Sequence, residues 1–357
     1  MGLITLLLAA ARPLFAAASL FRFITEKAGI IMEFLEIVWL GKPVWMWIGF
    51  MGLVIVLLAL DLGVLHKKQR EIGVAESLTL SAVYISLGLA FGGWVWWHLG
   101  EEPALAYVTG FVIEKSLAMD NVFVIAMIFT TFAILRVHQH RVLFWGILGV
   151  IILRAIMIGL GASLVQNFSW VLYIFAAFLI VTGVQMWRSA DKVYDVEANP
   201  ALRFIRKRFR VTEALHGQSF WVKQTDPKTG KLTWLMTPLF LALIMVEIVD
   251  LVFAVDSVPA IFAITTDPFI VYTSNIFAIL GLRALYFALA AMVHRFHYLK
   301  YALAILLVFI GSKIFVADAF GLAKIPPPVS LSITFAILVG GIGWSLWKTR
   351  GDAETIT

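Results

Sequence analysis

Ten charged side chains occur inside stretches of sequence that are otherwise apolar. Six are acids: Asp61, Glu114, Asp120, Glu247, Asp250 and Asp256. Four are bases: Lys115, Arg154, Arg283 and Lys313. At the centre of a lipid bilayer each such charge costs about 2.5–3.5 kcal/mol on the most lenient scale. If these stretches cross a membrane, we expect the charged side chains to face a protein interior or a water-filled cavity and to partner one another.

The oxygen atoms around the acids form a set that suits a hard divalent cation such as Mg²⁺, Ca²⁺ or Mn²⁺. The amide of Asn121 and the hydroxyl of Ser257 each follow an acid directly, and Pro259 predicts local unwinding that frees the carbonyl of Val255. Met119 would add a soft contact that favours Mn²⁺, although a methionine in such a stretch is more often filler. Six acids against four bases leave two negative charges, which one divalent cation or two protons would neutralise. The competing interpretation is that the acids and bases only form structural salt bridges.

The spacing of Glu114 and Asp120 limits how a cation could bind. They are six residues apart, which places them about 120° apart around a straight helix and about 9 Å apart along its axis. One ion therefore cannot contact both from a regular helix. The ligands must come from two helices, or one helix must be unwound.

The acidic motif occurs twice. Segments 114–123 and 250–259 share an acid, five residues, a second acid, a small polar residue and a valine, with an offset of 136 residues. Further matches follow in the same order: Leu-Arg-Ala at 153–155 and 282–284, and a Phe, Tyr and Gly pattern at 168–183 and 296–311. Three consecutive apolar stretches therefore repeat. Because the repeat contains an odd number of spans, its two copies would be inverted in the membrane, as is typical of secondary transporters.

The composition indicates an integral membrane protein. Of 357 residues, 61% are hydrophobic and only 14% are charged, against about 25% in a soluble domain. Cysteine is absent, which excludes disulfides, thiolate metal sites and cysteine nucleophiles. The seven histidines lie at or beyond the ends of the apolar stretches, which disfavours haem binding. The net charge of +6 does not indicate nucleic-acid binding, because basic residues of membrane proteins gather in cytoplasmic loops.

We predict an all-α polytopic fold with nine transmembrane helices and a 3+3 inverted repeat. A span needs about 20 mostly apolar residues. The nine stretches are Trp45–Leu65, Ser77–His98, Ala104–Phe132, Val142–Ser163, Trp170–Trp187, Trp234–Ile264, Phe269–Val293, Tyr301–Val316 and Val329–Trp347.

The basic residues between these spans predict the orientation. Nineteen Lys and Arg fall on one side, ten of them in segment 188–233, whereas the other side holds only Lys42 and Lys324. This places the N-terminus outside and the C-terminus in the cytoplasm.

The predicted organisation has five parts. Residues 1–31 are apolar but interrupted by Arg12, Pro13 and Arg22. They are an extra span, a signal-like segment, an amphipathic anchor or the product of a mis-assigned start, with Met32 as the first residue. The remaining parts are a first membrane half (32–187), a basic cytoplasmic loop (188–233), a second membrane half (234–347) and a cytoplasmic tail (348–357).

Three long motifs resemble the TerC family of bacterial membrane proteins, and its Alx branch most of all. They are residues 114–124, 250–270 and 275–284, and the resemblance covers roughly residues 40–347. It implies a multi-pass protein of the bacterial inner membrane that takes part in metal-ion homeostasis, with Mn²⁺ efflux as the best-supported role. The family name refers to tellurium resistance. If the family transports metal ions, this resistance would be an indirect consequence.

Carried over by motif, the resemblance implies a set of ion-handling residues. They are Glu114, Asp120, Asn121, Asp250, Asp256 and Ser257, with Asp61 and Glu247 as further family positions. Arg154, Arg283, Lys115 and Lys313 are expected to be counter-ions, with one arginine serving each half. The expected mechanism is alternating access that exchanges Mn²⁺ for protons, because buried carboxylates take up and release protons readily.

Three other functions fit the sequence less well. An oxyanion route for tellurite would use the four bases, but acids outnumber them. An intramembrane aspartyl enzyme is disfavoured because Gly-x-Gly-Asp is absent from both motifs. A membrane scaffold would recruit partners through segment 188–233. The simpler interpretation is that this basic segment lies on anionic lipid headgroups. We therefore expect no enzymatic activity and no resident cofactor. The expected partners are the lipid bilayer and a divalent metal ion, and no protein partner is indicated.

Overall fold

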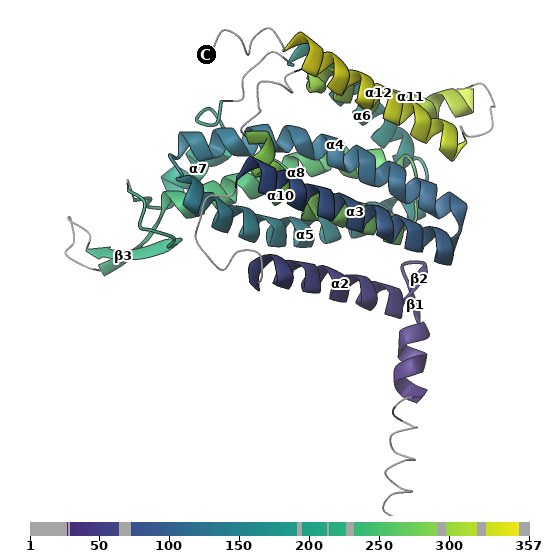
Figure 1. Cartoon of the computed structure of the whole chain (residues 1–357), viewed down its shortest axis with the longest axis horizontal. Coiled ribbons are helices and arrows are strands. Elements are labelled where there is room, and N and C mark those ends of the chain that lie inside the picture. Colours follow the sequence, from purple (N-terminus) through teal and green to yellow (C-terminus); the bar gives the residue numbers. More distant parts are fainter. Residues whose placement is uncertain are drawn as a thin grey trace, which may run out of the picture. The chain divides into compact units, whose positions relative to one another are not determined.

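A computed structural model describes residues 27, 29–63, 73–190, 195–212, 214–225, 232–290, 298–319 and 326–349 (Figure 1). The chain divides into two compact units, residues 1–67 and 68–357. Most of the predicted N-terminal extension (1–31) and of the predicted tail (348–357) lies outside the described residues.

The first unit contains a small hairpin followed by a long helix. Strands β1 (Val38–Trp39) and β2 (Lys42–Pro43) pair in antiparallel fashion. The turn between them has positive φ at Leu40 and at Gly41. Helix α2 (Val44–Gly63) follows at once and matches the first predicted span. The indole Nε1 of Trp47 donates to the carbonyl of Trp39 at 3.0 Å and so ties the first turn of the helix to the hairpin.

The second unit is helical, and its helices confirm the prediction of an all-α polytopic membrane protein. Each remaining predicted span corresponds to one helix or, in one case, to a helix pair. The helices are α3 (Val74–Leu99), α4 (Glu101–Thr131), α5 (Arg136–Asn167), α6 (Val171–Arg188), α8 (Pro238–Phe262), α9 (Pro268–Leu280), α10 (Leu282–Ala290), α11 (Leu299–Ala319) and α12 (Pro327–Lys348).

The number of spans is not fixed by the helices alone. In the described part of the chain, seven helices are long and apolar enough to cross a membrane, and α9 with α10 makes an eighth if the pair is one span. Helix α4 is not among them, because every 18-residue window in it holds at least three charged residues. Its 31 residues extend about 46 Å, more than the hydrocarbon core of about 30 Å. The total of nine depends on α4 and stays a prediction.

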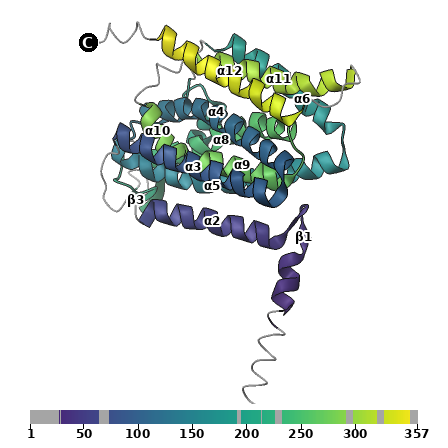
Figure 2. The ribbon, with the colours of Figure 1, turned by 45° about the vertical axis from the view of Figure 1, so that its right-hand side comes forward.

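Four helices form the centre of the second unit. Helix α4 packs against α8 and α9, and α5 packs against the same two helices. Helices α3 and α10 contact each other and α4, whereas α6, α11 and α12 lie together beside α4 and α8 (Figures 1 and 2). The first acids of the two motifs, Glu114 and Asp250, are therefore buried among these helices, whereas Leu251, Val252 and Val255 of α8 are exposed.

One pair of helix contacts agrees with the predicted inverted repeat. Exchanging α4, α5 and α6 for α8, α9 and α11 converts the α4–α9 contact into the α8–α5 contact, and both are present. Helices α6 and α11 cross closely at glycines in matched positions. A Cβ on Gly183 would lie 2.8 Å from the carbonyl oxygen of Ala304, and one on Gly311 would lie 2.6 Å from that of Ala176. These contacts support the repeat, which itself stays a prediction.

The break in the membrane helices lies elsewhere than predicted. Unwinding was expected at Pro259, but α8 continues through that residue to Phe262. The proline removes one backbone hydrogen bond, and it lies one turn from the helix end, so little helix follows it. The predicted continuous span Phe269–Val293 is instead bent by 41° between α9 and α10, at Gly281.

The segment between α6 and α8 forms short elements. Helix α7 (Pro200–Arg208) is capped by Asn199, whose side chain accepts from the N–H of Ala201. Strands β3 (Trp221–Thr225) and β4 (Leu232–Met236) form an antiparallel hairpin. The predicted start of the sixth span at Trp234 is therefore wrong. The helix starts at Pro238, because the side chain of Thr237 caps it and Pro238 suits its first turn.

Candidate functional site

Arg154 of α5 joins the first acids of the two motifs. Its Nη1 lies 2.7 Å from Oε1 of Glu114 on α4, and its Nε lies 3.7 Å from Oδ2 of Asp250 on α8. The arginine is 1% exposed. A buried arginine that lies between two carboxylates offsets part of the unfavourable free energy of burying both.

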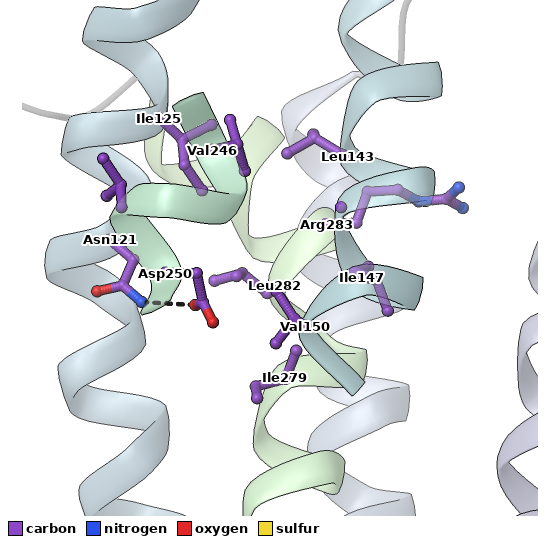
Figure 3. A pocket seen from close by; sticks show the side chains of 12 residues that line it. Asn121, Ile125, Leu143, Ile147, Val150, Val246, Asp250, Ile279, Leu282 and Arg283 are labelled. Atoms are coloured by element: carbon purple, nitrogen blue, oxygen red, sulfur yellow. Dashed lines mark hydrogen bonds between the residues drawn. The ribbon is translucent and has the colours of Figure 1, made fainter. Parts of the chain in front are cut away.

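Three polar side chains complete this group. Nη1 of Arg154 donates to the hydroxyl of Ser257 at 2.7 Å and to the amide oxygen of Asn275 on α9. Asn121 donates from Nδ2 to Oδ1 of Asp250 at 3.3 Å, as Figure 3 shows. The six residues Glu114, Asn121, Arg154, Asp250, Ser257 and Asn275 are called the arginine cluster below.

The arginine cluster joins the two motifs in a reciprocal way. Asn121 of the first motif binds the acid of the second, Asp250. Ser257 of the second motif and Glu114, the acid of the first, both contact Nη1 of Arg154. Within the described residues, several buried oxygens of the cluster accept no hydrogen bond: Oε2 of Glu114, Oδ1 of Asn121 and Oδ2 of Asp250. The cluster therefore has unused capacity to bind a positively charged group.

The second acids of the two motifs meet at one small cavity. Asp120 and Asp256 line it together with four cluster residues, Glu114, Asn121, Arg154 and Ser257. The space is close to that of a single water molecule. Oδ1 of Asp256 accepts a hydrogen bond from Thr182 of α6 at 3.3 Å, whereas Oδ1 of Asp120 accepts none within the described residues. The side chains of Met186 and Phe253 form part of the apolar wall.

A second pocket lies on the other side of Asp250. It is lined by Asn121, Asp250 and Arg283, and otherwise by apolar side chains of α4, α5, α8, α9 and α10 (Figure 3). In that view the guanidinium of Arg283 is directed away from Asp250. Its Nη1 lies 3.4 Å from Nδ1 of His140. One arginine was expected to serve each half, which would pair Arg283 with the acids of the second motif. Asp250 of that motif instead lies beside Arg154 of the first half.

The other predicted site residues lie outside the arginine cluster. Nζ of Lys115 donates to the carbonyl of Ala278 at 3.0 Å, and Nζ of Lys313 donates to the hydroxyl of Ser330 at 3.3 Å. The carboxylate of Glu247 packs directly on the backbone of α5 at Gly149. Asp61 lies near the end of α2 and belongs to the first unit.

The described acids do not form a ready-made metal shell. No group of three or more His, Asp or Glu side chains in the described ranges is arranged to hold a metal ion. The reason lies in the geometry at Glu114 and Asp250, which converge on the guanidinium of Arg154. The assignment of the acids as ion ligands stays a prediction.

Sequence reasoning missed two residues of this region, Asn275 and Thr182. Asn275 opens the third motif, but the matched position in the first copy of the repeat is Gly146, so the repeat did not mark it. The signal available in the sequence was a polar amide within an apolar stretch, and the structure shows that this amide is buried. The sequence offered no comparable signal for Thr182, because the hydroxyl of a threonine on a membrane helix commonly hydrogen-bonds the backbone of its own helix.

Comparison with known proteins decides the family. The family model described as "Integral membrane protein TerC family" matches residues 99–353, more than half of the chain. The chain belongs to the TerC family. An uncharacterized membrane protein of Myxococcus xanthus is 47% identical over 310 residues, which is 87% of this chain and 94% of that protein. A Rickettsia bellii membrane protein is 47% identical over 296 residues, with coverage of 83% and 95%.

A third relative has a more specific name. The Escherichia coli O157:H7 protein named "Putative membrane-bound redox modulator Alx" is 45% identical over 326 residues, which is 88% of this chain and 98% of that protein. No solved structure matches the chain. The resemblance to the TerC family and its Alx branch is thus confirmed, and the protein is a multi-pass integral membrane protein.

Proposed function

We propose that this protein transports a divalent metal cation across the membrane, most specifically Mn²⁺ in the direction of export. The observation that carries the proposal is the convergence of the two acidic motifs. Asp120 and Asp256, which occupy matched positions, line one cavity beside the ion pairs of Arg154. Membrane-embedded acids that meet at the interface between two repeats mark a cation pathway.

The chemistry of the cavity favours a cation over an anion. Three carboxylates line it, those of Glu114, Asp120 and Asp256, against the single guanidinium of Arg154. Carboxylate and hydroxyl oxygens suit Mg²⁺, Ca²⁺ and Mn²⁺. The thioether of Met186 in the wall adds a soft group, which favours Mn²⁺ over the two harder ions.

The charge balance supports exchange with protons. Four acids, Glu114, Asp120, Asp250 and Asp256, surround Arg154 and the cavity, and the charge of Lys300 acts on Asp120. Four acids against these two bases leave two negative charges if all are ionised. Buried uncompensated charges are strongly unfavourable. One divalent cation, or two protons, would neutralise them. Exchange of two protons for each cation would keep the site neutral throughout alternating access by the two helix triplets.

The location and orientation form part of the same proposal. The relatives described above come from bacteria, and the distribution of Lys and Arg places the long loop 188–233 in the cytoplasm. We place the protein in the bacterial plasma membrane, with its N-terminus outside and its C-terminus in the cytoplasm. Neither an enzymatic reaction nor a resident cofactor belongs to the proposal.

The name of the Escherichia coli relative does not lead to a redox function here. The chain contains no cysteine, so its own side chains offer no thiol for disulfide exchange. A change in the amount of a transported metal would alter redox balance indirectly, and this is compatible with a transporter.

Substitution of the second acids tests the proposal in cells. Asp120→Asn and Asp256→Asn each keep side-chain size and remove a charge, and we expect both to abolish manganese tolerance in a strain that depends on this protein. Membrane insertion and protein level should be unchanged. Asp195→Asn is the matched control, because Asp195 is exposed and binds only the backbone N–H groups of Glu197 and Ala198 among its described contacts. Full tolerance in both cavity variants at normal protein level would contradict the proposed cation site.

A further inference from the structure

The surroundings of the Arg154 guanidinium have the composition of a cation shell. Its partners are oxygens from four residues: Glu114, Asp250, Ser257 and Asn275. Two are carboxylates, one is a hydroxyl and one is an amide carbonyl, all of them ligands that hard divalent cations accept. They come from three helices, α4, α8 and α9. A cation held by these oxygens would take the place that the guanidinium now fills.

The contacts of Arg154 are of a kind that a cation can replace. A guanidinium binds a carboxylate most strongly through two parallel N–H donors, but neither carboxylate here is bound in that way. A single nitrogen, Nη1, is shared among Glu114, Ser257 and Asn275, and its two hydrogens cannot serve three acceptors fully. The Nε contact to Asp250 is 3.7 Å long, outside hydrogen-bonding distance.

The neighbouring cavity has space for about one water molecule, but its wall carries further carboxylates close to the guanidinium. Arg154 lines the cavity that Asp120 and Asp256 also line. A guanidinium that leaves Asp250 therefore has two further carboxylates on the same cavity wall. An incoming cation would move the guanidinium toward these carboxylates, which requires the cavity walls to move apart, and neither charge would then be uncompensated.

We propose that Arg154 is a tethered competitor of the transported cation. Its guanidinium occupies the position between Glu114 and Asp250 when no cation is bound, leaves when the cation enters, and returns to expel it. This inference rests on the proposed function, because it assigns a regulatory role within the same site. It also explains why the described acids converge on Arg154 and form no metal shell of their own.

A competitor and a purely structural counter-ion make opposite predictions for Mn²⁺ affinity. Removal of a competitor strengthens binding, whereas removal of a structural counter-ion distorts the site and weakens it. We expect Arg154→Gln to bind Mn²⁺ about ten-fold more tightly, the change expected if displacing the guanidinium opposes binding by about 1.4 kcal/mol. Counterflow of Mn²⁺ through the variant should be slower than in wild type, because the cation is no longer expelled.

The test is Mn²⁺ binding to the purified full-length protein, followed by the electron paramagnetic resonance signal of free Mn²⁺ at constant pH and ionic strength. Arg283→Gln is the matched control. It removes a second buried arginine from the same Leu-Arg-Ala setting, and in Figure 3 its guanidinium is directed away from Asp250. We expect no gain in affinity for it. Adding guanidinium ion to Arg154→Gln should weaken Mn²⁺ binding toward the wild-type value, whereas Na⁺ at equal ionic strength should not.

Arg154→Lys decides the matter if the Gln variant does not fold. Lysine keeps the charge but is shorter, so it reaches fewer of the four partners, and we expect Mn²⁺ affinity between those of wild type and a neutral variant. An affinity equal to or weaker than wild type in the folded Arg154 variants would overturn the inference, as would failure of guanidinium to compete. A wild-type protein that binds no divalent cation would instead overturn the proposed function, so the two failures are distinguishable.

Discussion

At the scale of single residues, Arg154 carries the charge balance of the protein interior. It contacts acids of both motifs, so its removal leaves two buried carboxylates without their counter-charge. Breaking a buried ion pair in this way costs about 3–5 kcal/mol. Stability and ion binding therefore respond to Arg154 in different directions, since the substitution that weakens the cation-free protein also removes the competitor.

A double-mutant cycle measures this coupling. We expect Arg154→Gln to lower the melting temperature in detergent, and Asp250→Asn or Glu114→Gln in the same chain to restore part of the loss. The expected coupling between Arg154 and either acid is about 1–3 kcal/mol, as for residues in direct contact. Arg283→Gln combined with Asp250→Asn should show a much smaller coupling. Near-additive effects for Arg154 with both acids would contradict the described ion pairs.

The sequence predicted the members of the site better than their pairing. The matched acids identified Glu114, Asp120, Asp250 and Asp256, because a repeated charge in an apolar stretch is a strong signal. The sequence did not predict that Arg154 would contact the acids of both halves, or that Arg283 would contact His140 instead. The rotation of each helix about its own axis decides which partner a long side chain reaches, and residue spacing alone does not determine that rotation.

At the scale of elements, the break between α9 and α10 depends on one close approach. A Cβ on Gly281 would lie 2.7 Å from Nζ of Lys115 and 3.0 Å from Cβ of Tyr84. The Lys115 ammonium in turn binds the carbonyl of Ala278 near the end of α9. Because a helix C-terminus carries partial negative charge, the lysine stabilises the broken end. The residue pair Glu114 and Lys115 thus attaches α4 to α9 through the arginine cluster and through this helix end.

Substitution of Gly281 tests this arrangement. Gly281→Ala forces the lysine away from the carbonyl or shifts Tyr84, and we expect a loss of stability of about 1–3 kcal/mol, as in other overpacked interiors. Thermal unfolding in detergent is the measurement. Gly159→Ala on α5 is the control, since its Cβ would meet nothing within 4 Å, and its effect should be much smaller. Equal effects for the two variants would show that Gly281 is not closely packed.

The sequence predicted most helices but placed the break wrongly. Apolar length located the helices of the described part, and the structure differs mainly at their ends. Proline was taken as the breaking signal, yet Pro259 lies so near the end of α8 that little helix follows it. The actual break has no proline. Lys115 and Tyr84 pack closely around Gly281 at the break, and only the three-dimensional arrangement defines this contact.

At the scale of the whole molecule, the count of spans decides whether the two helix triplets are inverted. Seven or eight helices of the described part qualify on length and apolarity, and the inverted arrangement requires α4 as an additional crossing. Its charged residues Glu114, Lys115 and Asp120 explain why hydropathy alone does not count it. Those residues are largely enclosed by neighbouring helices, so they need not meet lipid.

Reporter fusions test the crossing by α4. A reporter that works only in the cytoplasm should be active when fused after Lys223, in the basic loop, and inactive when fused after Glu102, at the start of α4. This follows from the difference in Lys and Arg between the two sides. Activity after Glu102, or inactivity after Lys223 in a stably inserted fusion, would contradict the nine-span topology and the inverted repeat with it.

Ion flux through the purified protein in liposomes tests the central claim most directly. A Mn²⁺-sensitive dye inside the vesicles reports entry while a proton gradient is imposed, with Mg²⁺, Ca²⁺ and tellurite compared under the same conditions. We predict Mn²⁺ flux that an opposing proton gradient accelerates and that Asp256→Asn abolishes. Flux of no divalent cation above that of empty vesicles, or tellurite flux that is unaffected by Asp256→Asn, would contradict the account.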